Sequence, residues 1–172
     1  MELLDRIFNI QSDEDFNACA LAVFRHQAEH TLIYKQYLQI LGVEPGNVDH
    51  YTKIPFMPIQ FFKSQDIINA GLETEVVFSS SGTTGMITSK HLVADASLYE
   101  RSFRLAFEQF YGDVKDLAIV ALLPSYLERT GSSLIYMVDD LIKHSEQKES
   151  NYFLYNHQDL FEVLQQLKEK GT

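Results

Sequence analysis

Apolar residues recur at three- and four-residue steps between positions 16 and 41, which is the spacing of one face of an α-helix. The series has a gap near the two histidines at its middle. Ser12 is a predicted N-cap ahead of this stretch, and Gly42 is the predicted C-cap behind it. The pattern therefore predicts that residues 1–70 form a mainly helical lead-in.

Residues 51–64 (YTKIPFMPIQFFKS) are apolar but contain Pro55 and Pro58. Two prolines so close together argue against an internal helix and against a central strand, because each removes a backbone N–H and restricts the chain before it. We expect an extended segment that packs over the core.

Beyond Gly71 the pattern changes to short apolar segments that alternate with helical periodicity. Asp95 is a predicted N-cap, and the continuous apolar run LAIVALL is typical of a buried strand in a parallel sheet. Predicted strands cover residues 75–78, 90–93, 117–123 and 152–155, and predicted helices cover residues 96–111, 131–144 and 157–170.

This order of strands and helices predicts an α/β fold, with a partial, mostly parallel sheet, flanking helices and a helical N-terminal region. The length of 172 residues suits one domain, with residues 1–70 as the lead-in and residues 71–172 as the alternating part. A sheet of so few strands would leave its last helix exposed. We therefore expect the domain to be incomplete and the chain to be the N-terminal portion of a larger enzyme.

The charge balance narrows the classes of partner. Lys and Arg total 14 and Asp and Glu total 24, a formal net charge of −10. Nucleic acids and anionic membrane surfaces both require a basic footprint, so neither is expected as the main partner. Cys19 is the one cysteine and is expected in the core. With no disulfide possible, no signal-peptide pattern and no membrane-spanning apolar run, we expect a cytoplasmic protein.

The segment 77–85 (VFSSSGTTG) carries the candidate chemistry, because a predicted strand leads into five hydroxyl residues and two glycines. Glycine permits close approach of a ligand to the backbone. Backbone N–H groups and Ser or Thr hydroxyls are uncharged donors that suit phosphate oxygens. The spacing is neither that of a Walker A loop nor that of a dinucleotide-binding turn. A serine- and threonine-rich turn without a ligand is the alternative reading.

This segment resembles the phosphate-binding loop of adenylate-forming enzymes, written [ST]-S-G-[ST]-T-G. Pro124, Tyr126 and Gly131 resemble the next motif of that superfamily, in which an apolar strand is followed by a proline, an aromatic residue and a glycine. Three further stretches resemble the LuxE-like acyl-protein synthetases, namely residues 54–63, 89–99 and 122–128.

The resemblance implies ATP-dependent activation of a carboxylic acid, such as a fatty acid, as an acyl-adenylate. The acyl group would then pass to a protein thiol or another acceptor, with ATP and Mg²⁺ required. Pro124 and Tyr126 would border the acyl group, and His91, close behind the loop, is a candidate ligand contact or a structural residue. The implied phosphate-binding residues are Ser80, Ser81, Gly82, Thr83, Thr84 and Gly85.

The later motifs of such enzymes have no match in this sequence. There is no recognisable aspartate for the ribose hydroxyls, no catalytic lysine and no late cysteine to receive an acyl group. Catalytic residues are therefore unassigned, and the chain alone is expected to be inactive in the full reaction. The alternative is a non-catalytic half-domain that docks on a partner.

A less favoured alternative is a zinc peptidase, because His26, Glu29 and His30 form the sequence H-x-x-E-H. The two histidines lie one helical turn apart and could share a metal, but no third ligand stands out, and no metal site is assigned. Elsewhere, the adjacent pair Asp139–Asp140 on a predicted helix is expected to form a solvated face or to act as helix-end charge.

Overall fold

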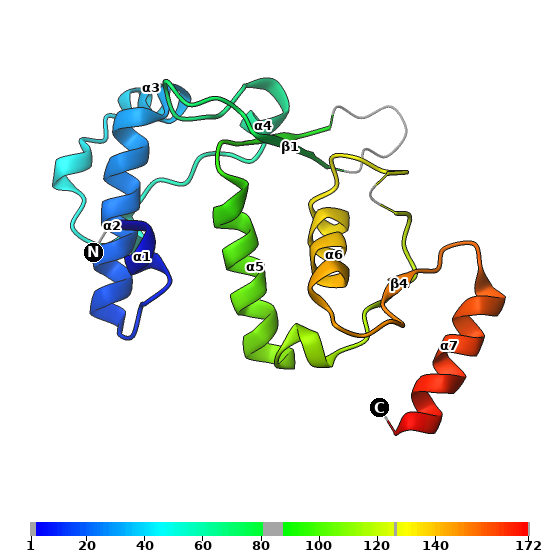
Figure 1. Ribbon diagram of the computed structural model, residues 1–172. Coiled ribbons are helices and arrows are strands. Elements are labelled where there is room, and N and C mark those ends of the chain that lie inside the picture. The colour runs from blue at the N-terminus through cyan, green and yellow to red at the C-terminus, as the bar shows by residue number, and fades with distance from the viewer. Residues whose placement is uncertain (1–2, 81–87, 126, 172) are drawn as a thin grey trace. The chain divides into compact units, whose positions relative to one another are not determined.

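The computed structural model describes residues 3–80, 88–125 and 127–171 of the chain. Two compact units are found, unit 1 (Met1–Ala94) and unit 2 (Asp95–Thr172), each with its own packing. Figure 1 shows their helices and strands in chain order. The boundary comes directly before the predicted N-cap Asp95, whereas the predicted change of pattern at residue 71 falls inside unit 1. The expectation of one domain over residues 1–172 stays a prediction.

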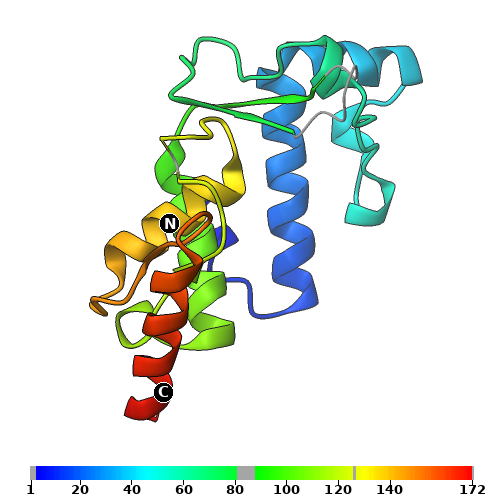
Figure 2. The same cartoon turned by 90° about the vertical axis from the view of Figure 1, so that its right-hand side faces the viewer.

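Three helices open unit 1: α1 (Leu3–Ile7), α2 (Asp13–His30) and α3 (Leu32–Leu41). The Ser12 hydroxyl accepts a hydrogen bond from the Asp15 N–H at 3.1 Å, which confirms the N-cap of α2, the long blue helix of Figure 2. Gly42 ends α3 in the left-handed conformation with φ of 67°, as a C-cap glycine does. The gap in the periodicity is real, because Thr31 is extended and separates α2 from α3.

Residues 43–70 cover one side of these helices. They contain η1 (Pro45–Asn47), η2 (Tyr51–Lys53) and the one-turn helix α4 (Phe61–Ser64). The prediction of a helix-free segment is wrong at its end, because α4 begins after Pro58, whose carbonyl accepts from the Phe61 N–H at 3.0 Å. A proline is excluded from a helix interior but can precede the first turn, where no N–H is required of it.

The core of unit 1 forms where the two long helices meet this covering segment. Ile54 and Met57 pack against it, which confirms the packing role expected for residues 51–64. The core residues themselves are Leu21, Phe24, Ala28, Tyr34, Leu38 and Val48. Cys19 is buried nearby on α2, as the sequence predicts.

Unit 1 ends in a two-stranded antiparallel sheet made of β1 (Val76–Ser79) and β2 (Lys90–Val93). In its register Phe78 lies opposite His91, and Ser79 lies opposite Lys90. Both strands agree closely with the predicted ranges, and of the two strands Phe78 alone is buried.

Unit 2 alternates helices with short strands: α5 (Ala96–Tyr111), η3 (Val114–Asp116), β3 (Val120–Ala121), α6 (Ser133–His144), β4 (Asn151–Tyr152) and α7 (His157–Lys170). Asp95 caps α5 by accepting from the Ser97 N–H at 2.9 Å. β3 and β4 pair in parallel, with α6 between them in the chain, so this part forms a strand–helix–strand unit.

The strands of unit 2 are shorter than predicted. β3 covers two residues of the predicted strand 117–123, and β4 begins at Asn151 and ends at Tyr152 rather than Tyr155. Within the described residues β4 is the sole strand paired with β3, so the ladder extends no further than this short neighbour.

The architecture is thus a mixture of helices with two small sheets, one parallel and one antiparallel. Helices hold 55% of the residues and strands 7%, so the predicted combination of helix and strand is confirmed at that level. In the described part of the chain, no helix has both the length and the apolar character needed to cross a bilayer.

Candidate functional site

The base of the predicted phosphate-binding segment is described in detail. The Ser80 N–H donates to the Ser89 carbonyl at 3.0 Å, and the Ser89 N–H donates to the Ser80 hydroxyl oxygen at 3.0 Å. The first bond continues the backbone pairing of β1 and β2 by one step, the second joins the Ser89 backbone to the Ser80 side chain, and Ser89 is buried. Ser80 therefore closes the base of the hairpin, and its predicted phosphate contact stays a prediction. The other five predicted residues, Ser81, Gly82, Thr83, Thr84 and Gly85, lie outside the described residues.

His91 lies on β2, two residues beyond the Ser80–Ser89 pair. Its exposed ring stacks on the ring of Phe62 from α4, with centroids 4.6 Å apart and planes 21° apart. The stacking joins α4 to the hairpin at His91. The structure thus places Ser80 and His91 on one hairpin of unit 1.

Pro124, the third described candidate, belongs to unit 2, where it follows β3 and is half-buried. The chain then turns, since the Ser125 N–H donates to the Glu128 carboxylate at 2.8 Å and the Ser125 carbonyl accepts from the Glu128 N–H at 3.1 Å. Tyr126, the aromatic residue of the predicted acyl border, lies outside the described residues.

The two histidines of the H-x-x-E-H sequence do lie side by side on α2, with ring centroids 4.5 Å apart. His26 Nε2 is 3.2 Å from the Asn69 side-chain amide, and His30 Nε2 is 3.8 Å from the Glu29 carboxylate. In residues 3–80, 88–125 and 127–171, no group of three or more His, Cys, Asp or Glu could hold a metal ion. A catalytic zinc site needs three protein ligands, so the described residues do not support a zinc peptidase.

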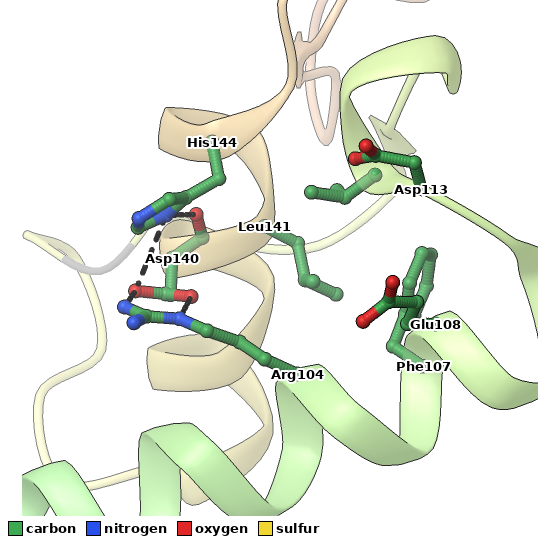
Figure 3. A pocket seen from close by; sticks show the side chains of 8 residues that line it. Arg104, Phe107, Glu108, Asp113, Asp140, Leu141 and His144 are labelled. Atoms are coloured by element: carbon green, nitrogen blue, oxygen red, sulfur yellow. Dashed lines mark hydrogen bonds and ion pairs between the residues drawn. The ribbon is translucent and has the colours of Figure 1, made fainter.

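A cluster of charged side chains in unit 2 was not foreseen. Arg104 on α5 donates to both carboxylate oxygens of Asp140 on α6, at 2.8 and 2.5 Å (Figure 3). It also donates to Glu100 at 3.1 Å. The hydrogen bond to Asp140 raises the pKa of Arg104. The Tyr136 hydroxyl donates to the other oxygen of Glu100 at 2.6 Å, and His144 lies 3.5 Å from Asp140.

The prediction of a solvated Asp139–Asp140 face is therefore wrong for Asp140, whose side chain is 11% exposed. A pocket of about 220 Å³ adjoins the cluster, with Phe107, Glu108, Asp113 and Leu141 among its walls. Two carboxylates offset the charge of Arg104. The cluster joins α5 to α6. In the sequence, the four-residue spacing of Glu100 and Arg104 on one predicted helix is the local pattern that points to part of this cluster.

Sequence reasoning also missed a larger pocket in unit 1. It measures about 730 Å³ and lies among α1, α2, α3 and residues 51–67. Apolar side chains dominate its walls, among them Phe16, Cys19, Val23, Phe24, Tyr34 and Ile54. Volume and lining match those of small-molecule sites.

Comparisons with known proteins return nothing similar: no protein-family model, no curated protein and no solved structure matches this chain. The arguments for function therefore come from the chain itself.

Proposed function

We propose that this chain supplies the phosphate-binding segment for ATP-dependent activation of a carboxylic acid. The observation that carries the proposal is the sequence Ser80–Gly85 between two paired strands. Rigid strands that end at one place give a glycine- and hydroxyl-rich segment a fixed base, which is what preorganised phosphate donors require. The reciprocal Ser80–Ser89 hydrogen bonds strengthen that base.

In the proposed reaction a carboxylate oxygen attacks the α-phosphorus of ATP. The bond between the α-phosphorus and the bridging oxygen to the β-phosphate breaks, and pyrophosphate leaves with that electron pair. A thiol of an acceptor protein, or another acceptor, then attacks the acyl carbon of the acyl-adenylate. The bond from that carbon to the phosphate oxygen breaks, AMP leaves with the electron pair, and the thiol proton is released. Ser81, Thr83 and Thr84 would donate to phosphate oxygens, with Gly82 and Gly85 allowing close backbone approach.

Mg²⁺ belongs to this proposal as the partner of the ATP phosphates. The described residues contain no acidic or histidine group of three that could hold a metal, so the ion would arrive with the nucleotide. We also propose that the two small sheets form part of an α/β architecture like that of the adenylate-forming enzymes. The parallel β3–β4 pair with α6 between the strands supports this.

Turnover by this chain alone is not expected. Cys19, the chain's only cysteine, is 4% exposed and lies within the apolar packing of unit 1, where it is poorly placed to accept an acyl group. Since the sequence also offers no match for the catalytic lysine of such enzymes, binding of nucleotide without hydrolysis is the expected behaviour.

One observation favours a second candidate function, that of a docking half-domain. α7 has no buried residue, and Phe161 and Leu164 are 55% and 49% exposed. An amphipathic helix with large exposed apolar side chains can present them to a partner protein. This candidate needs no nucleotide, which separates it from the first.

Titration calorimetry with Mg-ATP distinguishes nucleotide binding from the docking function. It is carried out on the wild-type chain and on the double variant Thr83→Ala/Thr84→Ala. The first proposal expects saturable binding that the double variant loses, and equal binding by the variant Thr88→Ala, which lies beyond the resembling segment. Binding that survives the double substitution would refute the assignment of the segment. A chain that binds no Mg-ATP would favour the docking candidate.

A further inference from the structure

The apolar pocket of unit 1 has walls from four parts of the chain. Ile7 comes from α1, Phe16 and Val23 from α2, Tyr34 from α3 and Met57 from the covering segment. Because elements distant in sequence line it within one compact unit, the space is an open pocket between several elements rather than one exposed helix face.

The Tyr34 and Thr31 hydroxyls of the lining are already paired. The Tyr34 hydroxyl donates to the Pro55 carbonyl at 2.7 Å, and the Thr31 hydroxyl lies 2.5 Å from the amide oxygens of both Gln27 and Asn69. None of the described residues that line the pocket is Asp, Glu, Lys, Arg or His. Burial raises the pKa of Tyr34 to about 12, in keeping with apolar surroundings.

The uncharged, mostly apolar lining restricts the kind of ligand that the pocket can bind. A peptide segment would bring backbone N–H and C=O groups that need partners, and the pocket has no charged side chain and few polar groups to receive them. An alkyl or aryl group needs none. The pocket volume of about 730 Å³ also lies within the range of roughly 300–1,000 Å³ typical of small-molecule sites.

One wall connects the pocket to the hairpin that carries the phosphate-binding segment. Phe62 lines the pocket and stacks on His91 of β2, and His91 lies opposite Phe78 of β1. Ser89 comes two residues before His91, and its hydrogen bonds with Ser80 close the base of the hairpin. The Phe62 end of the pocket is therefore next to the strands from which residues 81–87 emerge.

We propose that this pocket binds the apolar tail of the carboxylic acid, with the carboxylate at the Phe62–His91 end. The inference rests on the proposed function for the identity of the acid. It gives the tail a place within unit 1. It assigns Phe62 as a wall of the tail site and His91 as the first polar group beyond it.

Dodecanoate, below its micelle concentration, is the probe, and two alanines of α2 provide a matched pair of variants. Ala20 lines the pocket, whereas Ala18 is exposed and does not. Ala20→Phe fills the space, and Ala18→Phe adds the same ring outside it. By titration calorimetry, wild type and Ala18→Phe are expected to bind dodecanoate equally and Ala20→Phe about tenfold or more weakly. Thermal unfolding of each variant checks that it folds.

A second readout needs no variant. Cys19 lines the pocket, is 4% exposed and is the only cysteine of the chain, so the small neutral reagent methyl methanethiosulfonate is expected to react with it slowly and from the pocket side. Dodecanoate is expected to slow that reaction, and hexanoate to slow it less at equal concentration. This measurement decides the question even where Ala20→Phe fails to fold.

Equal dodecanoate binding by Ala20→Phe and wild type would overturn the proposal. So would the absence of binding together with an unchanged rate at Cys19. Neither result bears on Mg-ATP binding, because the titration of the Thr83→Ala/Thr84→Ala variant is made without acid. Failure of the tail pocket is thereby distinguishable from failure of the nucleotide assignment.

Discussion

At the centre of unit 1, aromatic and aliphatic side chains pack on one another, and the described ion pairs lie at its surface. Lys53–Asp49 joins side chains that are 62% and 72% exposed. In unit 2, a charged cluster joins α5 to α6, with Asp140 11% exposed and Glu100 27% exposed. Apolar packing is nearly indifferent to salt, whereas partly exposed ion pairs weaken as salt screens them. The two units should therefore respond differently to the same change in solvent.

The largest effect is expected in the core of unit 1. Leu38 is 2% exposed, and Leu38→Ala leaves a cavity that should lower the free energy of unfolding by about 2–5 kcal/mol. Ile40 on the same helix is 84% exposed, so Ile40→Ala is the matched control and should change the free energy of unfolding little. Urea unfolding followed by circular dichroism measures both. Equal losses in the two variants would contradict the packing described for α3.

An intermediate effect is expected in unit 2. Asp140→Ala removes both carboxylate oxygens from Arg104, and hydrogen bonds to charged groups contribute about 1.5–3 kcal/mol. Because the Arg104 side chain is 39% exposed, solvent screening should reduce the loss to about 1–2 kcal/mol. Lys143→Met breaks an exposed i,i+4 pair on the same helix and should cost less than about 0.5 kcal/mol.

Salt sharpens this comparison. In 1 M NaCl the screening length falls to about 3 Å, so the loss in free energy of unfolding caused by Asp140→Ala should become smaller. The loss caused by Leu38→Ala should stay the same. Urea midpoints measured at low and high salt supply the comparison. A salt-dependent deficit for Leu38→Ala would remove the proposed difference between the units.

The smallest expected effect is on the stability at alkaline pH, through the ionisation of one tyrosine hydroxyl in each unit. Burial raises the pKa of Tyr34, and also that of Tyr152, to about 12, and the nearby Asp139 carboxylate adds to the rise for Tyr152. Each raised pKa contributes stability that is present below the unfolded value near 10 and is lost between about pH 10 and pH 12. Asp139→Asn should lower the pKa of Tyr152 and leave that of Tyr34 unchanged.

Absorbance at 295 nm during alkaline titration follows both tyrosines, and Tyr34→Phe and Tyr152→Phe assign them. Tyr34→Phe should also lose about 1 kcal/mol at neutral pH, the usual net value of one hydrogen bond such as that to Pro55. If Asp139→Asn changed the pKa of Tyr34 as well, charge rather than burial would control that pKa.

Features set by near neighbours in the chain were predictable from sequence. Ser12, Gly42 and Asp95 act as caps because each satisfies backbone groups within a few residues of itself. The range of α7 follows from its periodicity and from Gly171, which ends it in the left-handed conformation.

Features that need a distant partner were not predictable. Asp140 reads as half of an acidic pair, but its partner Arg104 is 36 residues away on another helix. The apolar run 117–123 implied a long buried strand, yet strand length depends on the neighbour, and β4 pairs with two of its residues. The apolar pocket of unit 1 is a space between segments, so no single stretch of sequence carries its signature.

The reciprocal Ser80–Ser89 pair has a consequence for engineering. It lies directly behind the β1–β2 ladder and ahead of residues 81–87, so the register of Phe78 and His91 is set by bonds outside residues 81–87. Residues 81–87 can accordingly be treated as an exchangeable cassette. Segments of other composition or length could be grafted between Ser80 and Ser89 to change ligand preference, while α2, α3 and their core keep the sequence that folds them.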